Sequence, residues 1–300
     1  MSTPAPSSFT AFGLRAEAEP IAPGLHVVAT PIGNLRDISL RALATLAAAE
    51  AVIAEDTRVT RTLLAHYGIA TPLIAYHEHN AQVVRPQILA RLEKGAALAL
   101  VSDAGTPLVS DPGFKLVAEA VAAGVPVTAV PGASAVLAAL VVAGLPTDRF
   151  FFEGFLPQKS AGRRARLAEL AAVPGTLVFF ETPRRIVEVL EDCAAVLGAR
   201  EAAVARELTK HFETVRRGPL QELARIFATD EVLRGEIVLL VGPPAAGVGD
   251  IGEADLDARI RAALAGNSVK DAAAIVSGET GQPRRRVYAR ALQLAAGREK

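Results

Sequence analysis

Short apolar runs alternate with amphipathic helical patterns along most of this chain, and this alternation restricts the fold more than any other feature of the sequence. A short apolar run bounded by turn residues is typical of a buried strand, and apolar residues at helical spacing indicate a helix that packs on a sheet. Because crossover connections between parallel strands are right-handed, we expect α/β sheets that are largely parallel. In the first half, the predicted strands are Leu25–Ala29, Ala51–Ala54, Leu73–Tyr76, Ala96–Val101 and Val125–Val130, and the predicted helices are Leu40–Ala49, Arg58–Tyr67, Ala81–Lys94 and Phe114–Ala123.

The same rhythm restarts after Gly144-Leu145-Pro146, which indicates a second, consecutive α/β domain. The single cysteine, Cys193, falls at an apolar position of a helical pattern in this part, so we expect it to fill a core. The predicted strands here are Phe150–Glu153, Thr176–Phe180, Ala202–Arg206 and Glu236–Val241, and the predicted helices are Ala161–Ala172, Arg184–Leu197 and Gln221–Ala228.

Three further helical patterns, Leu256–Leu264, Val269–Ser277 and Arg284–Ala295, follow a segment rich in glycine and proline. The last begins with three arginines after a glycine-containing turn, which is typical of a helix-turn-helix, and a three-helix packing or dimerisation unit is an equal alternative. The predicted division of the chain is a flexible N-terminal tail at 1–23, an N-terminal α/β domain at 24–146, a C-terminal α/β domain at 147–243, a linker at 244–254 and a helical unit like a helix-turn-helix at 255–300.

The charges of the chain balance, with 32 basic and 32 acidic residues, which argues against a uniformly basic surface for nucleic acid. The basic residues are nevertheless concentrated in two segments, Lys159–Arg166 and Arg284–Arg290. This pattern suits an enzyme that meets a polyanion at one site. For either segment alone, a solvated helix face is an equal alternative.

The sequence carries no sign of export or of a membrane span. No apolar stretch reaches the length of about 18 residues that spans a bilayer without a charge or a proline, and no secretory signal begins the chain. One cysteine cannot form an internal disulfide, which fits a reducing compartment. We therefore expect a cytoplasmic protein.

The segment 102–113, SDAGTPLVSDPG, directly follows the most apolar predicted strand. In open α/β sheets, ligands bind at the carboxyl ends of the strands, where loops lead into helices. Glycine lets the backbone approach a ligand closely, and proline stiffens the loop. This loop is therefore the first place to look for a ligand site.

Six short motifs, each at the end of a predicted strand, occur in one order along the chain and resemble the tetrapyrrole-methylase superfamily. The first, TPIGNLRD at 30–37, has fewer glycines than the enzymes that methylate macrocycles, so the resemblance is closer to the branch that methylates ribosomal RNA. The other motifs are Ala54–Arg58, Tyr76–Asn80, Ser102–Gly113, Val130–Ala135 and Phe152–Pro157. The resemblance covers roughly residues 24–244, and the terminal helical unit matches the tail of the same branch.

This resemblance implies S-adenosylmethionine held in a cleft between two α/β domains. Asp103 would accept hydrogen bonds from the ligand, and free N–H groups near Ser134 would suit its carboxylate. Phe155 and Leu156 would cover the adenine. The candidate cofactor-binding residues are Pro31, Ile32, Asp103, Gly105, Thr106, Pro107, Ser134, Ala135, Phe155, Leu156, Leu208, Glu236 and Ile237.

The reaction that the resemblance implies is 2′-O-methylation of a cytidine ribose in 16S ribosomal RNA of the small ribosomal subunit, by an enzyme that forms a homodimer. In-line methyl transfer requires alignment and the exclusion of water, and a base or a positive field would help a neutral hydroxyl to attack. The candidate acid–base residues are Glu55, Asp56 and His79. The candidate RNA-binding residues are Arg36, Arg58, Arg61, Lys159, Arg163, Arg164, Arg184, Arg185, Arg284, Arg285 and Arg286.

Other interpretations stay open at this stage. The chain could methylate a tetrapyrrole on carbon, or it could be a nucleic-acid-binding regulator that senses a small ligand. The sequence His77-Glu78-His79 suggests a metal site, but it lacks a third ligand, so we expect no metal. The motifs of dinucleotide-binding and Walker loops are absent from the sequence.

Overall fold

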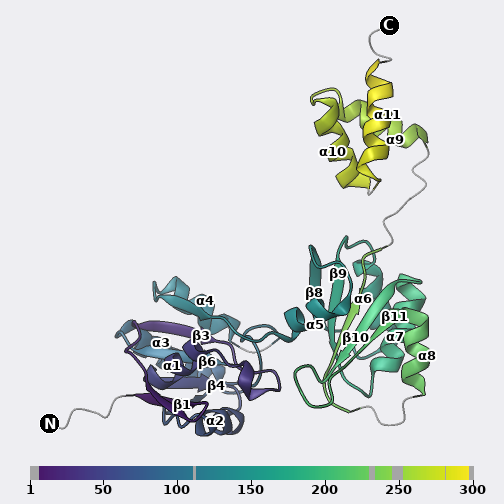
Figure 1. Cartoon of the computed structure of the whole chain (residues 1–300). Helices are drawn as coiled ribbons and strands as arrows, with labels where there is room; N and C mark the ends of the chain where they lie inside the picture. Colours follow the sequence, from purple (N-terminus) through teal and green to yellow (C-terminus); the bar gives the residue numbers. More distant parts are fainter. Residues whose placement is uncertain (1–6, 111–112, 230–233, 245–252, 281, 297–300) are drawn as a thin grey trace, which may run out of the picture.

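The computed structural model describes residues 7–110, 113–229, 234–244, 253–280 and 282–296 (Figure 1). The described elements are β1 (Ser8–Ala11), β2 (Leu14–Glu17), β3 (Gly24–Val28), α1 (Leu40–Ala48), β4 (Ala51–Ala54), α2 (Thr57–His66), β5 (Leu73–Ala75), α3 (Ala81–Glu93), β6 (Ala97–Val101), α4 (Phe114–Ala122), β7 (Val127–Val130), α5 (Ala135–Ala143), β8 (Phe150–Phe155), α6 (Ser160–Leu170), β9 (Thr176–Glu181), α7 (Ile186–Leu197), β10 (Glu201–Arg206), β11 (Thr214–Pro219), α8 (Leu220–Ala228), β12 (Ile237–Val241), α9 (Glu253–Ala263), α10 (Val269–Thr280) and α11 (Arg284–Ala296).

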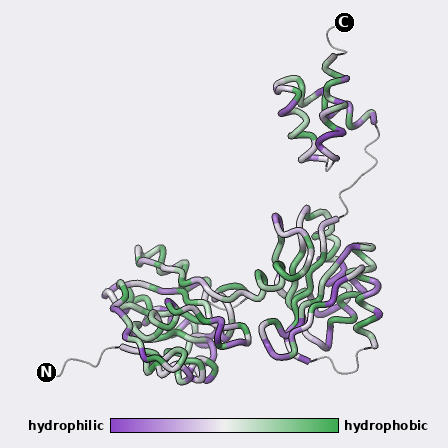
Figure 2. Tube along the Cα trace, viewed as in Figure 1, coloured by the Kyte–Doolittle hydropathy of each residue, from purple (hydrophilic) through white to green (hydrophobic). Residues whose placement is uncertain are grey.

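The first domain is built on a five-stranded sheet in the order β5-β4-β6-β3-β7, in which every neighbouring pair is parallel, as predicted. Its central strand β6 is buried at every position because helices cover both faces of the sheet. Alternate residues of β6 therefore join different cores: Ala99 packs with residues of α1 and α2, and Leu98 packs with residues of α3 and α4. The strands of both α/β domains are largely hydrophobic (Figure 2).

The second domain has a five-stranded mixed sheet in the order β11-β10-β12-β9-β8. Three of its pairs are antiparallel and β8 with β9 is parallel, so the prediction of a largely parallel second sheet is wrong. The loop 207–213 between β10 and β11 is too short for a parallel crossover, which needs about a dozen residues. Strand β11 was not predicted because Val215 is the one branched aliphatic residue in it and it lies at the sheet edge.

Helix α5 follows the last strand of the first domain in sequence, yet it packs on the second sheet. Its buried residues Val136, Ala139 and Leu140 share a core with Val178 of β9 and Leu240 of β12. The chain thus crosses from the first domain to the second before α5. The predicted boundary, between residues 24–146 and 147–243, lies after α5 and therefore assigns this helix to the other domain.

The segment predicted as a flexible tail contains an antiparallel hairpin of β1 and β2. Phe9 is buried in the core of the first domain, next to residues of α1, and the amide of Thr10 donates a hydrogen bond of 2.7 Å to the carbonyl of Tyr67. The prediction of flexibility is therefore wrong for residues 8–17. Residues 1–6 of the predicted tail, and 245–252 of the predicted linker, lie outside the described residues.

The three predicted C-terminal helices are confirmed as α9, α10 and α11, which share a small core of their own. Arg290 of α11 forms an ion pair with Asp257 of α9 at 2.7 Å, which links these two helices. Ser268 accepts a hydrogen bond from the amide of Asp271 and so caps α10. Among the described helices, none has the length and apolarity needed to cross a bilayer.

Candidate active site

A cavity of about 300 Å³ lies between the two α/β domains, where the carboxyl ends of β3, β6 and β7 meet the end of β9 and the start of β12. This is the position at which parallel α/β sheets bind ligands. The first domain contributes backbone-rich loops, and the second contributes mainly apolar side chains. The lining residues are Ile32, Ala104, Gly105, Thr106, Val109, Ser110, Ser134, Ala135, Val136, Phe155, Phe180, Glu181, Thr182, Ala205, Leu208, Gly235, Glu236, Ile237 and Val238.

Hydrogen bonds join the loops that follow β3, β6 and β7. Thr30 and Gly105 exchange two backbone hydrogen bonds, of 2.8 and 3.1 Å, and the Thr106 hydroxyl donates to the carbonyl of Ala133 at 3.1 Å. Gly105 has a φ of +79°, which glycine adopts without strain. Leu108 and Ser110 also have positive φ, a strained conformation that is often found at functional sites. These hydrogen bonds tie the three loops together at the cavity.

The first turn of α5 opens into the cavity. Ser134 caps the helix by accepting a hydrogen bond from the amide of Leu137, and Ser134, Ala135 and Val136 all line the cavity. Amides of a first helical turn have no partner within the helix and carry partial positive charge. This end of the cavity is thus suited to a carboxylate, and the opposite walls at Phe155 and Phe180 are suited to an aromatic ring.

Nine of the thirteen predicted cofactor-binding residues line this cavity: Ile32, Gly105, Thr106, Ser134, Ala135, Phe155, Leu208, Glu236 and Ile237. Leu156 does not, because its side chain is 2% exposed and packs with Leu167 and Phe179 in the core of the second domain. That prediction is wrong. Pro107 is buried and is absent from the cavity walls.

The two remaining residues, Pro31 and Asp103, line a second cavity of about 420 Å³. The two cavities adjoin, because Ile32, Ala104 and Glu236 line both. Like the first cavity, the second is lined by four hydroxyl side chains, and it has three charged ones, Asp103, Lys210 and Glu236. Its other lining residues are Thr30, Gly33, Leu35, Val59, Thr60, Thr62, Leu63, Ser102 and Lys210.

Sequence reasoning missed several residues of the first cavity, notably Phe180-Glu181-Thr182 at the end of β9. The ring of Phe180 lies 5.8 Å from that of Phe155, which also lines the cavity, and 4.9 Å from that of Phe152, which does not. The signal was present, because these residues end a predicted strand. Burial raises the pKa of Glu181, against the opposing effects of the Thr182 amide and of Arg185.

The three candidate acid–base residues line neither cavity. Asp56 caps α2 and binds the guanidinium of Arg58, and this hydrogen bonding lowers its pKa to about 2, which makes it a weak base. His79 is exposed beside His77, with 6.0 Å between the ring centroids. Across the described ranges, no group of three or more His, Cys, Asp and Glu side chains is placed to hold a metal ion.

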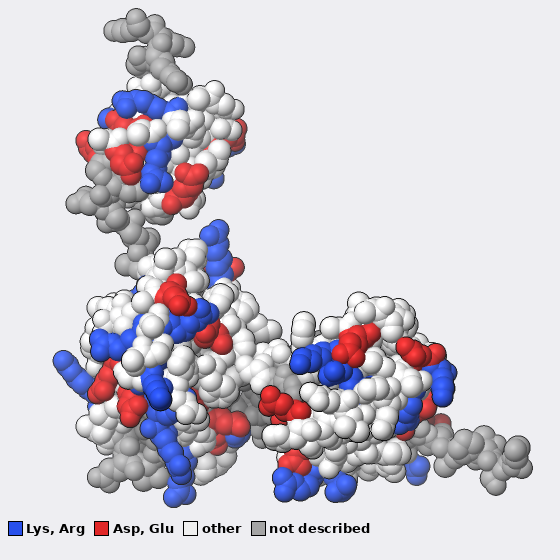
Figure 3. All heavy atoms as spheres, turned by 180° about the vertical axis from the view of Figure 1, so that it is seen from behind, with Lys and Arg blue, Asp and Glu red and all other residues white. Residues whose placement is uncertain are grey.

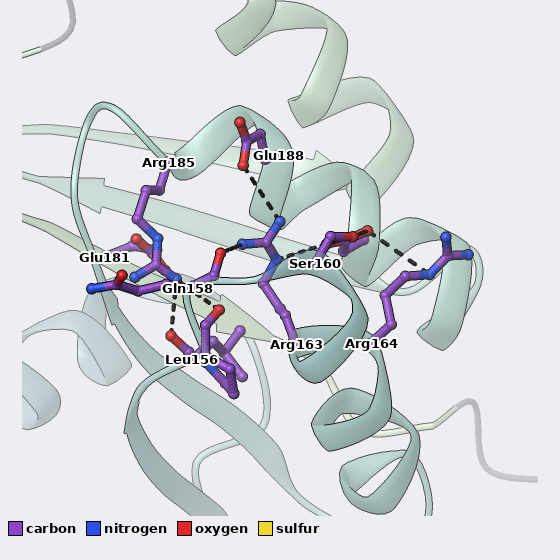
Figure 4. Close-up of polar contacts among 10 residues, drawn as sticks. Leu156, Gln158, Ser160, Arg163, Arg164, Glu181, Arg185 and Glu188 are labelled. Atoms are coloured by element: carbon purple, nitrogen blue, oxygen red, sulfur yellow. Dashed lines mark hydrogen bonds and ion pairs between the residues drawn. The ribbon is translucent and has the colours of Figure 1, made fainter.

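The predicted RNA-binding residues divide into exposed and internal ones. Arg163 is 1% exposed and binds Asp192 at 2.7 Å, Glu188 at 3.5 Å and the carbonyl of Gln158 at 3.2 Å (Figure 4). A phosphate cannot reach it, so that prediction is wrong. Arg185 is half-buried and binds Glu181 at 3.0 Å. The exposed members are Arg36, Arg58, Arg61, Lys159, Arg164, Arg184, Arg284, Arg285 and Arg286.

Residues 24–224 match the family model of tetrapyrrole (corrin/porphyrin) methylases, and residues 250–295 match the model of the RsmI C-terminal HTH domain. The chain is 50% identical over 278 residues to the ribosomal RNA small subunit methyltransferase I of Mesorhizobium japonicum, covering 92% of this chain and 94% of that protein. It is 50% identical to the protein of the same name from Pseudomonas aeruginosa, covering 90% and 96%. A solved structure of cobalt precorrin-4 methyltransferase aligns with a TM-score of 0.55 at 20% identity, covering 73% of this chain and 94% of that one.

Proposed function

Because this chain belongs to the tetrapyrrole methylase family, we propose that it transfers the methyl group of S-adenosylmethionine to the ribose 2′-oxygen of a cytidine in 16S ribosomal RNA. The names of its curated relatives support the ribosomal RNA of the small subunit as the substrate. The observation that carries the proposal is the cavity between the domains, with a helix N-terminus at one end and an aromatic wall at the other.

The chemistry of the cavity fits the proposed cofactor. The amides at the start of α5 would bind its carboxylate, and Phe155, Leu208 and Ile237 would contact its apolar and aromatic parts. Gly105, whose Cβ would come within 3.2 Å of the Ile32 side chain, keeps the backbone close to the ligand. When bound, the cofactor supplies an electrophilic methyl group on a sulfonium.

The second cavity adjoins the first and is the proposed position of the target ribose. Its hydroxyl groups and Asp103 would orient the sugar, and the Asp103 carboxylate is itself oriented by the amide of Asp56 at 3.0 Å. Methyl transfer by in-line displacement depends mainly on such alignment and on the exclusion of water. The acid–base roles of Glu55, Asp56 and His79 find no support in these positions.

The exposed arginines at the start of α11, Arg284–Arg286, are proposed to bind RNA phosphates, together with Arg36 and Arg61 near the cavities. Phosphate contacts of this kind position a nucleic acid without reading its sequence. Because the substrate would be a ribosomal subunit, we place the protein in the cytoplasm.

We also propose a homodimer. Leu137 and Val141 of α5 are 54% and 77% exposed, on the side of the helix away from its core, and a second copy would cover these apolar groups. The molar mass in solution tests this, with Val141→Glu expected to give monomers and a wild-type monomer contradicting it.

The test of the activity uses small ribosomal subunits from cells that lack the enzyme. The purified protein and methyl-labelled S-adenosylmethionine are added, and the label is mapped on the digested RNA. We expect label at one ribose 2′-oxygen, a strong loss with Asp103→Asn, and no loss with Asp148→Asn, an exposed aspartate outside both cavities. Cofactor binding without any label on the RNA would contradict the proposed substrate, and no cofactor binding would contradict the proposed site.

A further inference from the structure

The loop 207–213, between β10 and β11, brings a lysine of the second domain to the second cavity. Lys210 lines this cavity together with Asp103 of the first domain. Its alkyl chain lies so close to the loop after β3 that a Cβ on Gly33 would come within 2.5 Å of the Lys210 Cγ. Lys210 therefore lies where the two domains meet, close to the residues that line both cavities.

Two carboxylates hold the ammonium group of Lys210. Its Nζ donates to Glu207 at 2.8 Å and to Glu236 at 2.9 Å. Partial burial opposes the charged form, but these hydrogen bonds outweigh it and raise the pKa of Lys210. The same hydrogen bond from Lys210 lowers the pKa of Glu207. At neutral pH, Lys210 is thus a fixed cation that donates hydrogen bonds and does not act as a base.

The geometry leaves one donor for a ligand. An ammonium group has three N–H bonds, and two of them are used by Glu207 and Glu236. Within the part of the chain that the structure describes, no acceptor is assigned to the third. Since Glu236 lines both cavities and Lys210 lines the second, this donor lies beside the proposed ribose position.

The backbone that presents Lys210 is strained. Glu207 and Thr209 have φ values of +53° and +65°, which side chains other than glycine rarely adopt. The buried hydroxyl of Thr209 has no hydrogen-bond partner, and a Cβ on Gly235 would come within 2.2 Å of the Glu207 carboxylate. Strain of this kind persists where the surrounding structure enforces it and is concentrated at functional sites. It is an observation independent of the ion pairs.

We propose that Lys210 is a catalytic residue that donates a hydrogen bond to the attacking ribose oxygen, an inference that rests on the proposed function. The oxygen forms its bond to the methyl carbon while the carbon–sulfur bond breaks and its electron pair stays on sulfur. The hydroxyl proton passes to a water molecule before the oxygen attacks, which leaves an alkoxide. A fixed cation beside the oxygen lowers the pKa of the hydroxyl and stabilises the negative charge of this alkoxide.

The test exchanges the ammonium group chemically. In a Lys210→Cys variant, alkylation with 2-bromoethylamine restores an ammonium on a side chain of nearly lysine length, and alkylation with iodoacetamide adds a neutral amide. The native Cys193 is buried, and burial raises its pKa to about 12, so the new cysteine is the one that reacts. Wild-type protein treated with both reagents, and Lys94→Cys on the exposed end of α3, are the controls.

We expect the single-turnover rate of Lys210→Cys to fall by about 10²–10³-fold, the usual loss when one donor to a developing oxyanion is removed. Bromoethylamine should restore most of the rate and iodoacetamide should not, with the affinity for S-adenosylmethionine unchanged throughout. The residual rate of the variant should rise with pH, because the hydroxyl then ionises without help. Equal rescue by both reagents, or an unchanged rate in the variant, would overturn the proposal.

Failure of the proposed function has a different signature. If wild-type protein binds the cofactor but transfers no methyl group to the subunits, the substrate assignment fails, and this inference fails with it. If Lys210→Cys lowers cofactor affinity in parallel with the rate, Lys210 acts in binding and not in the chemical step. A variant that does not fold is replaced by Lys210→Arg, which keeps the cation and should retain methyl transfer where Lys210→Gln does not.

Discussion

The two basic segments of the sequence, Lys159–Arg166 and Arg284–Arg290, have opposite structural roles. In the first, Arg163 is enclosed by carboxylates of α7 (Figure 4), and Arg166 binds Glu153 and Glu169, both at 2.6 Å. In the second, Arg284–Arg286 are exposed, and Arg290 pairs with Asp257. Figure 3 shows basic and acidic groups interspersed on one face of the molecule.

The difference depends on helix position and on acids that are remote in sequence. Arg163 lies on the same side of α6 as Leu167 and Leu170, which faces the core, and its partner Asp192 is supplied by α7. The three arginines of α11 precede its first buried residue, Val287, and their charges oppose the helix dipole at the N-terminus. Arg163 and Arg166 of the first segment therefore stabilise the fold, whereas Arg284 and Arg285 of the second are exposed and suited to an anionic partner.

The largest expected effect follows replacement of Arg163. Arg163→Met keeps much of the side-chain volume but leaves Asp192 without its buried partner, and breaking a buried pair in this way costs about 3–5 kcal/mol. Denaturant unfolding measures the loss. The neighbouring Arg164→Met, at a side chain that is 53% exposed, should change stability by less than about 0.5 kcal/mol. Equal effects of the two variants would remove the distinction between internal and surface arginines.

A smaller effect, on binding and not on folding, is expected in α11. Replacing Arg284, Arg285 and Arg286 together by glutamine should weaken RNA binding about 10- to 100-fold and reduce the slope of log affinity against log salt by about 2–3. The melting temperature should not fall, because the three charges oppose the helix dipole. Arg259→Gln on α9 is the control. An unchanged salt slope would show that these arginines contact no phosphate.

The smallest effect concerns Cys193 of α7, which follows Asp192, the partner of Arg163. Burial is the main cause that raises the pKa of its thiol from 9.0 to about 12. The folded state therefore favours the protonated thiol. The contribution of Cys193 to the free energy of unfolding is complete below about pH 9 and is lost as the pH rises from 9 toward 12. Stability should fall by about 1 kcal/mol between pH 8 and pH 10, and Cys193→Ala should remove that part of the dependence. The same pH dependence in the variant would assign it to other groups.

The fold could be predicted wherever the apolar residues of a single strand or helix form a recognisable pattern. The strands of the parallel sheet are apolar throughout because both faces are covered, and the six strand-end motifs identified the family, which the comparisons confirm. Two edge elements, β11 and the hairpin of β1 and β2, could not be found in this way. Strand β11 and the hairpin of β1 and β2 have few buried positions, so their sequences resemble loops.

The site could be predicted in part for the same reason. Loops that follow strands, such as 104–106 and 134–135, line the first cavity, and their positions follow from topology. Side-chain roles depend on register and on remote partners. A bulge between Phe152 and Gly154 changes the register of β8, after which Phe155 lies at the cavity and Leu156 in the core. Lys210 lies in a loop that approaches Gly33 of the other domain, and this proximity has no signal in the local sequence.

The placement of α5 has a thermodynamic consequence. Its body belongs to the core of the second domain, and its N-terminus completes a cavity whose other wall is the loop after β6 of the first. A ligand would bind there only while both domains are folded and in contact. Its binding free energy would therefore add to the interaction free energy between the two domains. Unfolding of the two domains should therefore be more cooperative with saturating ligand than without it.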